Sequence, residues 1–333
     1  MAKCLVTGAA GFIGAHVNKA LLDAGHETTA LDDLSGGFIE NVDPQSRFIE
    51  GSICDRDLIQ RLFREGSFDY VFHMAAYAAE GLSHFIKHFN YTNNLLGSVN
   101  LINASINHEV QCFVFTSSIA VYGKGQLPMT EEMMPMPEDS YGIAKSAVEQ
   151  ELKASREMFG LDYVIFRPHN VYGEWQNIGD RYRNVIGIFI NQVMQRQPLS
   201  IFGDGEQTRA FSYVGDLAPI IARSPGVAAA RGQIFNVGAD VPCTVNELAR
   251  TVCELMGVPD HPILRHEARN EVKHAYSDHA RVKKVFGDAP ATDLRTGLER
   301  MIQWARKVGA RKGSRFENIE IMKNLPPFWT QED

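Results

Sequence analysis

The first half of the chain alternates short apolar runs with longer segments whose apolar residues recur at helical spacing. Apolar runs bounded by turn residues are typical of buried strands, and the periodic segments are typical of helices that cover one face of a sheet. This alternation predicts a parallel, doubly wound α/β sheet. Strands are predicted at Lys3–Thr7, Glu27–Leu31, Arg47–Glu50, Tyr70–His73, Cys112–Thr116 and Asp162–Phe166, and helices at Phe12–Leu22, Tyr91–Asn107 and Tyr141–Phe159.

The alternation becomes irregular in the second half, where polar loops separate the apolar segments. Helices are still predicted at Val185–Gln195 and Val245–Met256, and Ile234–Val237 has the composition of one more buried strand. We therefore expect residues 1–170 to form the sheet domain, completed by a strand returning near 234–237. Residues 171–333 are expected to form mainly a smaller, discontinuous domain over the carboxyl ends of the strands.

The turn between the first predicted strand and helix is rich in glycine and reads TGAAGFIG. Gly8 allows a sharp turn, Gly11 leaves room for a pyrophosphate against bare backbone, and Gly14 lets the helix pack closely on the strand. The helix N-terminus then offers unpaired N–H groups to phosphates. This predicts a dinucleotide-binding Rossmann domain. The spacing GxxGxxG has one extra residue, and a glycine turn without a ligand is the alternative interpretation.

An acidic residue, Asp32, follows directly after the second predicted strand. A carboxylate there accepts hydrogen bonds from the ribose hydroxyls of NAD and repels the 2′-phosphate of NADP. No lysine or arginine follows until Arg47, so we expect NAD as the cofactor. A solvated turn carboxylate is the alternative for Asp32 and for its neighbour Asp33.

Composition excludes several classes of function. The chain has 333 residues, 44% of them hydrophobic, which is enough for a large core and more than one domain. The net charge of −7, without a long basic block, argues against nucleic-acid binding. We expect no signal peptide, no membrane span and no metal site, and a cytoplasmic location. The cysteines lack CxxC spacing and fit reduced core residues: Cys4, Cys54, Cys112, Cys243 and Cys253.

The candidate catalytic residues are Ser118, Tyr141 and Lys145. The tyrosine and the lysine are spaced to project from one face of a helix. A free tyrosine has a pKa near ~10, and a nearby ammonium together with a positive nicotinamide ring favours the phenolate and lowers that pKa. Tyr141 would then remove a proton from a substrate hydroxyl while the carbon gives a hydride to the cofactor, with Ser118 bonded to the same hydroxyl. A surface i,i+4 pair is the alternative.

These residues lie in segments that resemble the extended short-chain dehydrogenase/reductase family, in particular its nucleotide-sugar epimerases and dehydratases. The resemblance runs nearly from end to end and is more specific for the family than for the substrate. It is carried by residues 7–14 (TGAAGFIG), 71–76 (VFHMAA), 94–97 (NLLG), 115–123 (FTSSIAVYG), 141–145 (YGIAK), 166–173 (FRPHNVYG) and 202–209 (FGDGEQTR).

The resemblance implies a role for each matching position. Besides Asp32 at the adenosine ribose, the positions expected to hold the cofactor are Gly8, Gly11, Phe12, Ile13, Gly14, Ser52, Ile53, Met74, Ala75, Ala76, Asn94, Thr116, Tyr141, Lys145 and Pro168. The positions expected to bind a nucleotide-sugar substrate are Ser118, Asn170, Asn184, Val185, Arg209, Arg269 and Ala275, with the Arg209 guanidinium suited to a diphosphate.

One segment departs from the family pattern. Many relatives have an aspartate that contacts the adenine amine after the third strand, and Ser52 stands at that position here. Asp55 either replaces it or serves as the N-cap of the following helix.

The residues after Ser118 distinguish between reactions. Dehydratases of this family place an acid and a base there, a decarboxylase places Glu at the second position, and a 3,5-epimerase places Cys; this chain has Ile119 and Ala120, which move no proton. A 4-epimerase needs only the Ser, Tyr and Lys set with NAD. His169 and Arg183 resemble the 3,5-epimerase branch, although arginine is a poor base. Arg181 and Arg183 are charge anchors or belong to a solvated loop.

The favoured interpretation is therefore a UDP-sugar 4-epimerase. Ala275 stands where family members limit space around the sugar C2 substituent, so UDP-GlcNAc and UDP-GalNAc are allowed beside UDP-glucose and UDP-galactose. The alternatives are a 4-dehydrogenase, a uronate 4-epimerase, a 3,5-epimerase, a dehydratase and a dinucleotide-sensing protein without activity. The resemblance and the helices at 91–107 and 141–159 further predict a homodimer joined by a four-helix bundle.

Overall fold

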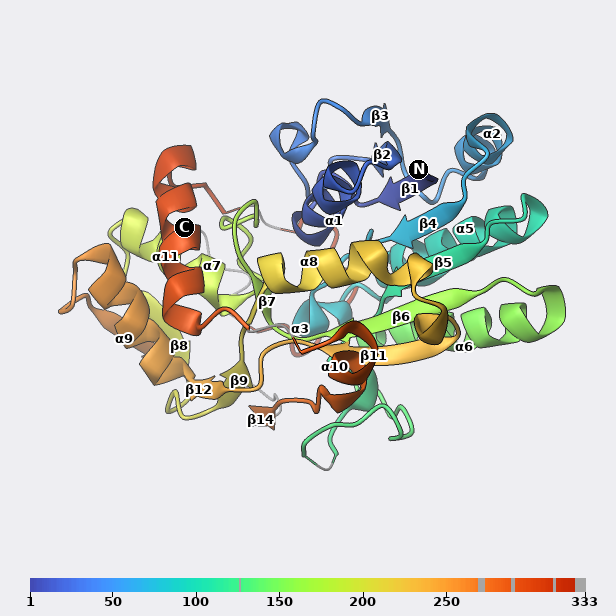
Figure 1. Cartoon of the computed structure of the whole chain (residues 1–333). Helices are drawn as coiled ribbons and strands as arrows, with labels where there is room; N and C mark the ends of the chain where they lie inside the picture. Colours follow the sequence, from blue (N-terminus) through green and yellow to red (C-terminus); the bar gives the residue numbers. More distant parts are fainter. Residues whose placement is uncertain (126, 269–272, 289–290, 314–315, 327–333) are drawn as a thin grey trace.

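The computed structural model describes residues 1–125, 127–268, 273–288, 291–313 and 316–326 (Figure 1). Its centre is a seven-stranded sheet in which every neighbouring pair is parallel. This confirms the predicted fold class. In sheet order the strands are β11 (Gln233–Val237), β6 (Tyr163–Pro168), β5 (Cys112–Thr116), β4 (Tyr70–His73), β1 (Lys3–Thr7), β2 (Glu27–Asp32) and β3 (Arg47–Glu50).

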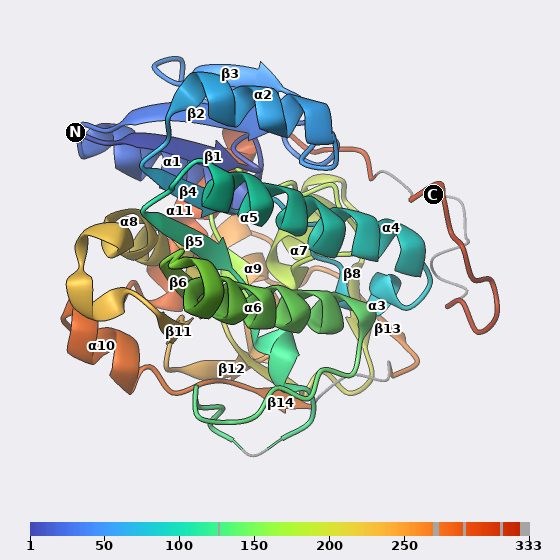
Figure 2. The same ribbon diagram turned by 90° about the vertical axis from the view of Figure 1, so that its right-hand side faces the viewer.

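Helices cover both faces of the sheet because its strands are apolar on both sides; every residue of β5 is buried. Apolar residues of α1, α8 and α10 pack on one face, and those of α2, α5 and α6 pack on the other, where Figure 2 shows them side by side. The bounds are α1 (Phe12–Asp23), α2 (Arg56–Gly66), α5 (Gly97–Asn107), α6 (Ser140–Phe159), α8 (Val214–Arg223) and α10 (Ala280–Phe286).

The long helix predicted from Tyr91 begins earlier and is not regular throughout. It starts as α4 (Lys87–Tyr91), passes through a π-helical turn, η2 (Thr92–Leu96), and continues as α5. A π-turn widens the helix locally and often marks a functional site. Here it brings Asn90 and Asn94 inward, where the amide of Asn94 donates to Asn90 Oδ1 at 2.8 Å.

A second core forms beside the carboxyl ends of the strands. Its helices α7 and α9 match the predictions within one residue, and α9 begins with a capping box between Thr244 and Glu247. Helix α11 was not predicted. The division at residue 170 stays a prediction, since α8 and α10 from the second half also cover the sheet. The elements here are β7 (Val171–Tyr172), α7 (Val185–Met194), β8 (Leu199–Phe202), β9 (Thr208–Ala210), β10 (Ser212–Tyr213), β12 (Pro242–Thr244), α9 (Val245–Met256), β13 (Ile263–His266), β14 (His274–Ala275) and α11 (Leu294–Val308).

The segment after α11 crosses back to the first domain. Arg311 contacts both sides: its backbone N–H donates to Asn191 Oδ1 at 2.9 Å on α7, and its guanidinium lies 3.4 Å from the centre of the Phe38 ring. Farther along, both Glu320 carboxylate oxygens accept backbone N–H groups at the start of α4, each at 2.8 Å. The C-terminal segment therefore ties the two halves together. No helix among the described residues is long and apolar enough to cross a membrane.

Candidate active site

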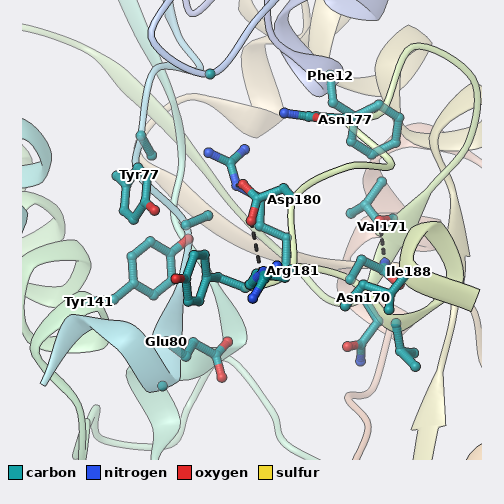
Figure 3. A pocket seen from close by; sticks show the side chains of 18 of the residues that line it. Phe12, Tyr77, Glu80, Tyr141, Asn170, Val171, Asn177, Asp180, Arg181 and Ile188 are labelled. Atoms are coloured by element: carbon teal, nitrogen blue, oxygen red, sulfur yellow. Dashed lines mark hydrogen bonds and ion pairs between the residues drawn. The ribbon is translucent and has the colours of Figure 1, made fainter. Parts of the chain in front are cut away.

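A cleft of about 2480 Å³ opens across the carboxyl ends of the strands, between the sheet and the second core. This is where open parallel sheets bind ligands. Figure 3 shows Tyr77 and Tyr141 on one side of the cleft and Asn170 and Ile188 on the other, with the loop that carries Arg181 between them. A single ligand site usually occupies roughly 300–1,000 Å³, so this cleft has room for a dinucleotide and a second ligand together.

The glycine loop forms one wall of the cleft. Gly8 has a φ of 68°, and a Cβ on it would lie 2.7 Å from the Cα of Ala75. A Cβ on Gly14 would lie 2.0 Å from the Gly8 carbonyl oxygen, so neither position tolerates a side chain. Helix α1 then begins at Phe12, and its N-cap Gly11 offers no side-chain hydrogen bond; the first turn contains no acidic residue. Its free N–H groups and bare backbone fit the pyrophosphate of a dinucleotide.

Asp32 supports this loop from the end of β2. Its Oδ2 accepts the backbone N–H of Ala10 at 3.0 Å, and its Oδ1 accepts that of Leu34 at 2.8 Å. Burial raises the pKa of Asp32, and these two hydrogen bonds oppose that rise. The side chain is therefore not the solvated carboxylate of the alternative interpretation. Each oxygen keeps acceptor capacity for a ribose hydroxyl, because a carboxylate has about four acceptor positions.

The structure brings Ser118, Tyr141 and Lys145 together on the opposite wall. Ser118 caps the short helix η3 (Ile119–Tyr122), where its Oγ accepts the N–H of Ala120 at 3.1 Å. Tyr141 and Lys145 lie on α6, and the hydroxyls of Tyr141 and Ser118 share a hydrogen bond. The Lys145 ammonium donates to the carbonyl oxygen of Thr116 at 2.7 Å, which fixes it at the end of β5.

Burial dominates the electrostatics of these groups. It lowers the pKa of Lys145 to about 7, against the opposing influence of the Glu149 carboxylate. Burial also raises the pKa of Tyr141, and the carboxylate of Glu80 raises it further, while the hydrogen bond with Ser118 lowers it. The expected lowering of the Tyr141 pKa counted on the ammonium and the nicotinamide ring together, so it stays a prediction for the cofactor-bound protein; in the protein alone that pKa is raised. An additional positive charge is needed to favour the phenolate.

A buried ion pair, which sequence reasoning missed, braces the catalytic segments. Arg167 on β6 and Glu149 on α6 lie 2.5 Å apart, and both side chains are 1% exposed. Ser117 donates to the same Glu149 carboxylate at 2.5 Å, and the Arg167 guanidinium stacks 4.6 Å from the ring centre of Tyr122. The pair thus joins β5, β6, α6 and η3. The sequence did contain a signal for this ion pair: Arg167 lies inside an otherwise apolar strand, and arginine is rarely buried without a partner.

Two expected cofactor residues do not line the cleft. Asn94 is buried behind it and bonds the backbone of Tyr77, accepting the N–H at 2.8 Å and donating to the carbonyl oxygen at 3.1 Å. Ser52 accepts the N–H of Cys54 at 3.2 Å in the turn before α2. Asp55 is the N-cap of α2, accepting the N–H of Leu58 at 3.0 Å. Ile53, in contrast, does line the cleft.

The other expected positions lie along the cleft wherever the structure describes them. On the cofactor side these are Gly8, Gly11, Phe12, Ile13, Gly14, Asp32, Ile53, Met74, Ala75, Ala76, Thr116, Tyr141, Lys145 and Pro168. On the substrate side they are Ser118, Asn170, Asn184, Val185, Arg209 and Ala275. Arg269 lies outside the described residues.

The substrate side is held by backbone hydrogen bonds. Asn184 caps α7 and donates to the Val171 carbonyl oxygen at 2.7 Å. Asn170 adopts a left-handed conformation with a φ of 41°, a strained state that is frequent at binding sites. Arg209 lies in register with Ala275 across the β9–β14 pair, so a guanidinium and a small side chain stand next to each other.

Among the described residues, no cluster of His, Cys, Asp and Glu could hold a metal ion.

The loop between β7 and α7 also lines the cleft. Its Arg183 pairs with Asp180 at 2.9 Å and lies 5.4 Å from the ring centre of Tyr77. Arg181 is another lining residue and extends into the cleft in Figure 3. This position favours the charge-anchor interpretation of the two arginines over that of a solvated loop.

Known proteins are similar in sequence to most of this chain. Residues 4–238 match the model of the NAD dependent epimerase/dehydratase family. The UDP-glucose 4-epimerase of Mycolicibacterium smegmatis is 33% identical over 311 residues, which are 91% of this chain and 98% of that protein.

Solved structures agree over the same extent. The UDP-glucose 4-epimerase of Thermotoga maritima, with UDP-glucose, has a TM-score of 0.86 at 32% identity over 92% of this chain and 99% of that chain. The UDP-N-acetylglucosamine 4-epimerase of Methanobrevibacter ruminantium, in complex with UDP-N-acetylmuramic acid, has the same TM-score of 0.86 at 30% identity and the same coverage.

The buried amine predicts that Lys145→Met stabilises the fold. The folded-state pKa of Lys145 is about 7, whereas an unfolded lysine titrates near ~10.4. The unfolded chain therefore binds an extra proton between these values, so the cost of burial is complete below about pH 7 and disappears above about pH 10.4. We expect denaturant unfolding at pH 6.5 to show a gain on the order of 2 kcal/mol that shrinks at pH 10.

Lys153→Met is the matched control, because Lys153 lies exposed on the same helix and carries no burial cost. Equal effects of the two substitutions, or a gain at Lys145 that is the same at both pH values, would contradict this account of the amine.

Proposed function

Because the chain belongs to the NAD-dependent epimerase/dehydratase family, we propose that it inverts C4 of a UDP-hexose. Its cofactor is NAD. The observation that carries the proposal is the pair Ile119 and Ala120, which follow Ser118 in the cleft wall and have no proton to move. UDP-glucose and UDP-galactose are the first substrates to test, with UDP-GlcNAc and UDP-GalNAc beside them.

The proposed chemistry needs one base and one orienting group from the protein. Tyr141 takes the proton of the C4 hydroxyl and later returns it, and the Ser118 hydroxyl orients the same oxygen. Bound NAD, which the glycine loop and Asp32 would hold, would supply the hydride acceptor and donor for C4 and a positive charge that favours the Tyr141 phenolate. Lys145, held by the Thr116 carbonyl, stabilises that phenolate.

Inversion also requires the 4-keto sugar to turn over before it is reduced. The volume of the cleft supports this step, and in this proposal Arg209 holds the diphosphate and Asn184 contacts the nucleotide while the sugar rotates. The small side chain of Ala275 lines the cleft, which favours room for a C2 substituent during that rotation.

One observation favours a second candidate, a reaction that also exchanges a ring proton. Glu80 on α3 (Glu80–Ser83) lines the cleft near Tyr141, where its carboxylate raises the pKa of that tyrosine (Figure 3). A carboxylate near the reacting sugar is the kind of group that a dehydratase or a 3,5-epimerase uses as a base. Exchange of solvent hydrogen into C3 or C5 separates this candidate from simple C4 inversion.

Tyr141→Phe tests the proposed base. The substitution keeps the ring and removes the hydroxyl, so turnover should fall by about 10²-fold or more while UDP-sugar affinity changes little. The assay incubates the protein with each UDP-sugar and follows the anomeric NMR signals of the C4 epimers. Tyr163→Phe, on the buried end of β6 away from the cleft, is the control. Wild-type rates in the Tyr141 variant would refute the assignment.

Ala275→Tyr tests the sugar specificity. Ala275 is 7% exposed and lines the cleft, so a tyrosine there should strike an acetamido group at C2. We expect kcat/KM for UDP-GlcNAc to fall at least about tenfold more than that for UDP-glucose, which corresponds to ~1.4 kcal/mol. The unsubstituted sugar is the control within the same variant. An equal loss on both substrates would place the C2 pocket elsewhere.

We also propose that the protein is a homodimer joined through α4–α5 and α6. Figure 2 shows α4, α5 and α6 side by side at the surface. In these helices Leu96 is 57% exposed and Ile143 is 43% exposed, although helices of a monomer usually turn such residues inward. Light scattering should give twice the chain mass of 37.1 kDa, and Leu96→Glu with Ile143→Glu should give the monomer. Ile263→Glu, on exposed β13, is the control. A wild-type monomer at micromolar concentrations would contradict the proposal.

A further inference from the structure

Two buried histidines meet at the cleft, where His169 belongs to the lining and His279 lies against it. His169 follows β6 and is 2% exposed, and His279 follows β14 and is 3% exposed. Their Nε2 atoms lie 3.1 Å apart, while the ring centres are 5.2 Å apart and the ring planes differ by only 16°. The nitrogen atoms are thus much closer than the rings, so the two imidazoles face each other edge to edge across a hydrogen bond.

The outer partners fix one proton on each ring. His169 Nδ1 lies 2.9 Å from the carbonyl oxygen of Ala210, which can only accept, so this nitrogen carries a proton. His279 Nδ1 lies 2.6 Å from Asp240 Oδ1. Burial opposes ionisation of that carboxyl, but hydrogen bonds from His279 and Lys283 lower the pKa of Asp240, so it is a carboxylate acceptor. His279 Nδ1 therefore carries a proton as well.

The hydrogen bond between the rings needs a third proton. If neither Nε2 were protonated, two lone pairs would face each other at 3.1 Å in a buried site, which is repulsive. The Asp240 carboxylate lies against His279, whereas His169 Nδ1 faces only the carbonyl oxygen of Ala210, so the geometry points to His279 as the ring that holds the extra proton. Burial and the neighbouring imidazole also lower the pKa of His169 to about 4. His279 Nε2 then donates to His169, with the hydroxyl of Ser277 at 3.1 Å as its second neighbour.

Other charged groups near the pair either stabilise or destabilise the extra proton. Asp240 stabilises the extra proton directly. Lys283 weakens that effect, because its ammonium also pairs with Asp240 at 2.7 Å. His279 is the N-cap of α10, whose partial positive end also disfavours a cation there, and Asp278 on the same turn offsets part of this.

The pair connects segments that line the cleft from different parts of the chain. His169 lies between Pro168, on the cofactor side, and Asn170, on the substrate side. His279 follows the strand that carries Ala275, and Asp240 follows β11. We propose that His169 and His279 share one extra proton held by Asp240, and that this charged pair positions the Ala275 strand against the Pro168–Asn170 loop for substrate binding. The positioning role rests on the proposed function.

Loss of the shared proton would separate the two walls without moving α6, which carries Tyr141 and Lys145. We therefore expect KM for the UDP-sugar to rise at alkaline pH while kcat changes little. Asp240→Asn removes the anion that holds the proton, so the midpoint of the KM rise should move to lower pH by about one unit, equivalent to a tenfold weaker hold on the proton.

Asp288→Asn is the matched control. It makes the same change in net charge and also removes a carboxylate near Lys283, but it does not contact the histidines. Its KM profile should follow that of the wild type. His279→Gln should give a raised KM that no longer varies with pH over the same range. Identical KM profiles for the Asp240 variant and the wild type would overturn the positioning role.

A second measurement does not depend on turnover. Nitrogen NMR of the imidazoles in the NAD-bound protein at pH 7 should show both nitrogens of His279 protonated and only Nδ1 of His169 protonated, with the signals assigned through His279→Gln. A neutral His279 at pH 7 would overturn the shared proton. If no UDP-sugar reacts, the proposed function fails, but the NMR result still decides the charge of the pair.

Discussion

Burial of charge at the junction of β5, β6 and α6 is the constraint on which the catalytic site depends. An ammonium, a carboxylate and a guanidinium lie in the interior there, and such groups are costly unless fixed partners replace water. Lys145 uses the Thr116 carbonyl, and Glu149 and Arg167 use each other. These bonds allow little relative movement of the strand ends and the helix. The positions of Ser118 and Tyr141 follow from that rigidity.

Because these groups are buried, the catalytic site is complete only when the cofactor is bound. The interior lowers the pKa of Lys145 and raises that of Tyr141, so the protein alone disfavours both charged forms. Glu80 adds to the effect on the tyrosine. A positive ring beside them would favour the phenolate, which ties the base to the loaded state of the enzyme.

Sequence reasoning predicted the sheet well because its strands are buried on both faces and therefore read as continuous apolar runs. The glycine loop, Asp32 and the Tyr141–Lys145 pair could be predicted for a similar local reason, since each depends on a strand end or on helical spacing. Ser118 was predicted from the end of its own strand, and the tertiary fold brings it beside Tyr141. Helix α11 was missed although Leu298, Met301, Ile302 and Ala305 repeat at helical spacing and are buried. That signal was present in the sequence.

Other features of the structure cannot be predicted from the sequence around the residues concerned. Asn94 and Ser52 stand at family cofactor positions, but Asn94 bonds the backbone of Tyr77, Ser52 bonds that of Cys54, and neither is among the residues that line the cleft. The contact between His169 and His279 joins residues far apart in the chain, and neither neighbourhood indicates the other. Hydrogen bonds of this kind depend on the tertiary fold, so only the structure reveals them.

The central claim is that the cleft inverts C4 and moves no other carbon-bound hydrogen. The most direct measurement is the fate of a label: a UDP-hexose carrying deuterium at C4 is converted in ordinary water, and an unlabelled one is converted in deuterium oxide. The account predicts that deuterium stays at C4 in both epimers and that none enters from solvent. Solvent deuterium at C3 or C5, or a 4-keto-6-deoxy product, would contradict it.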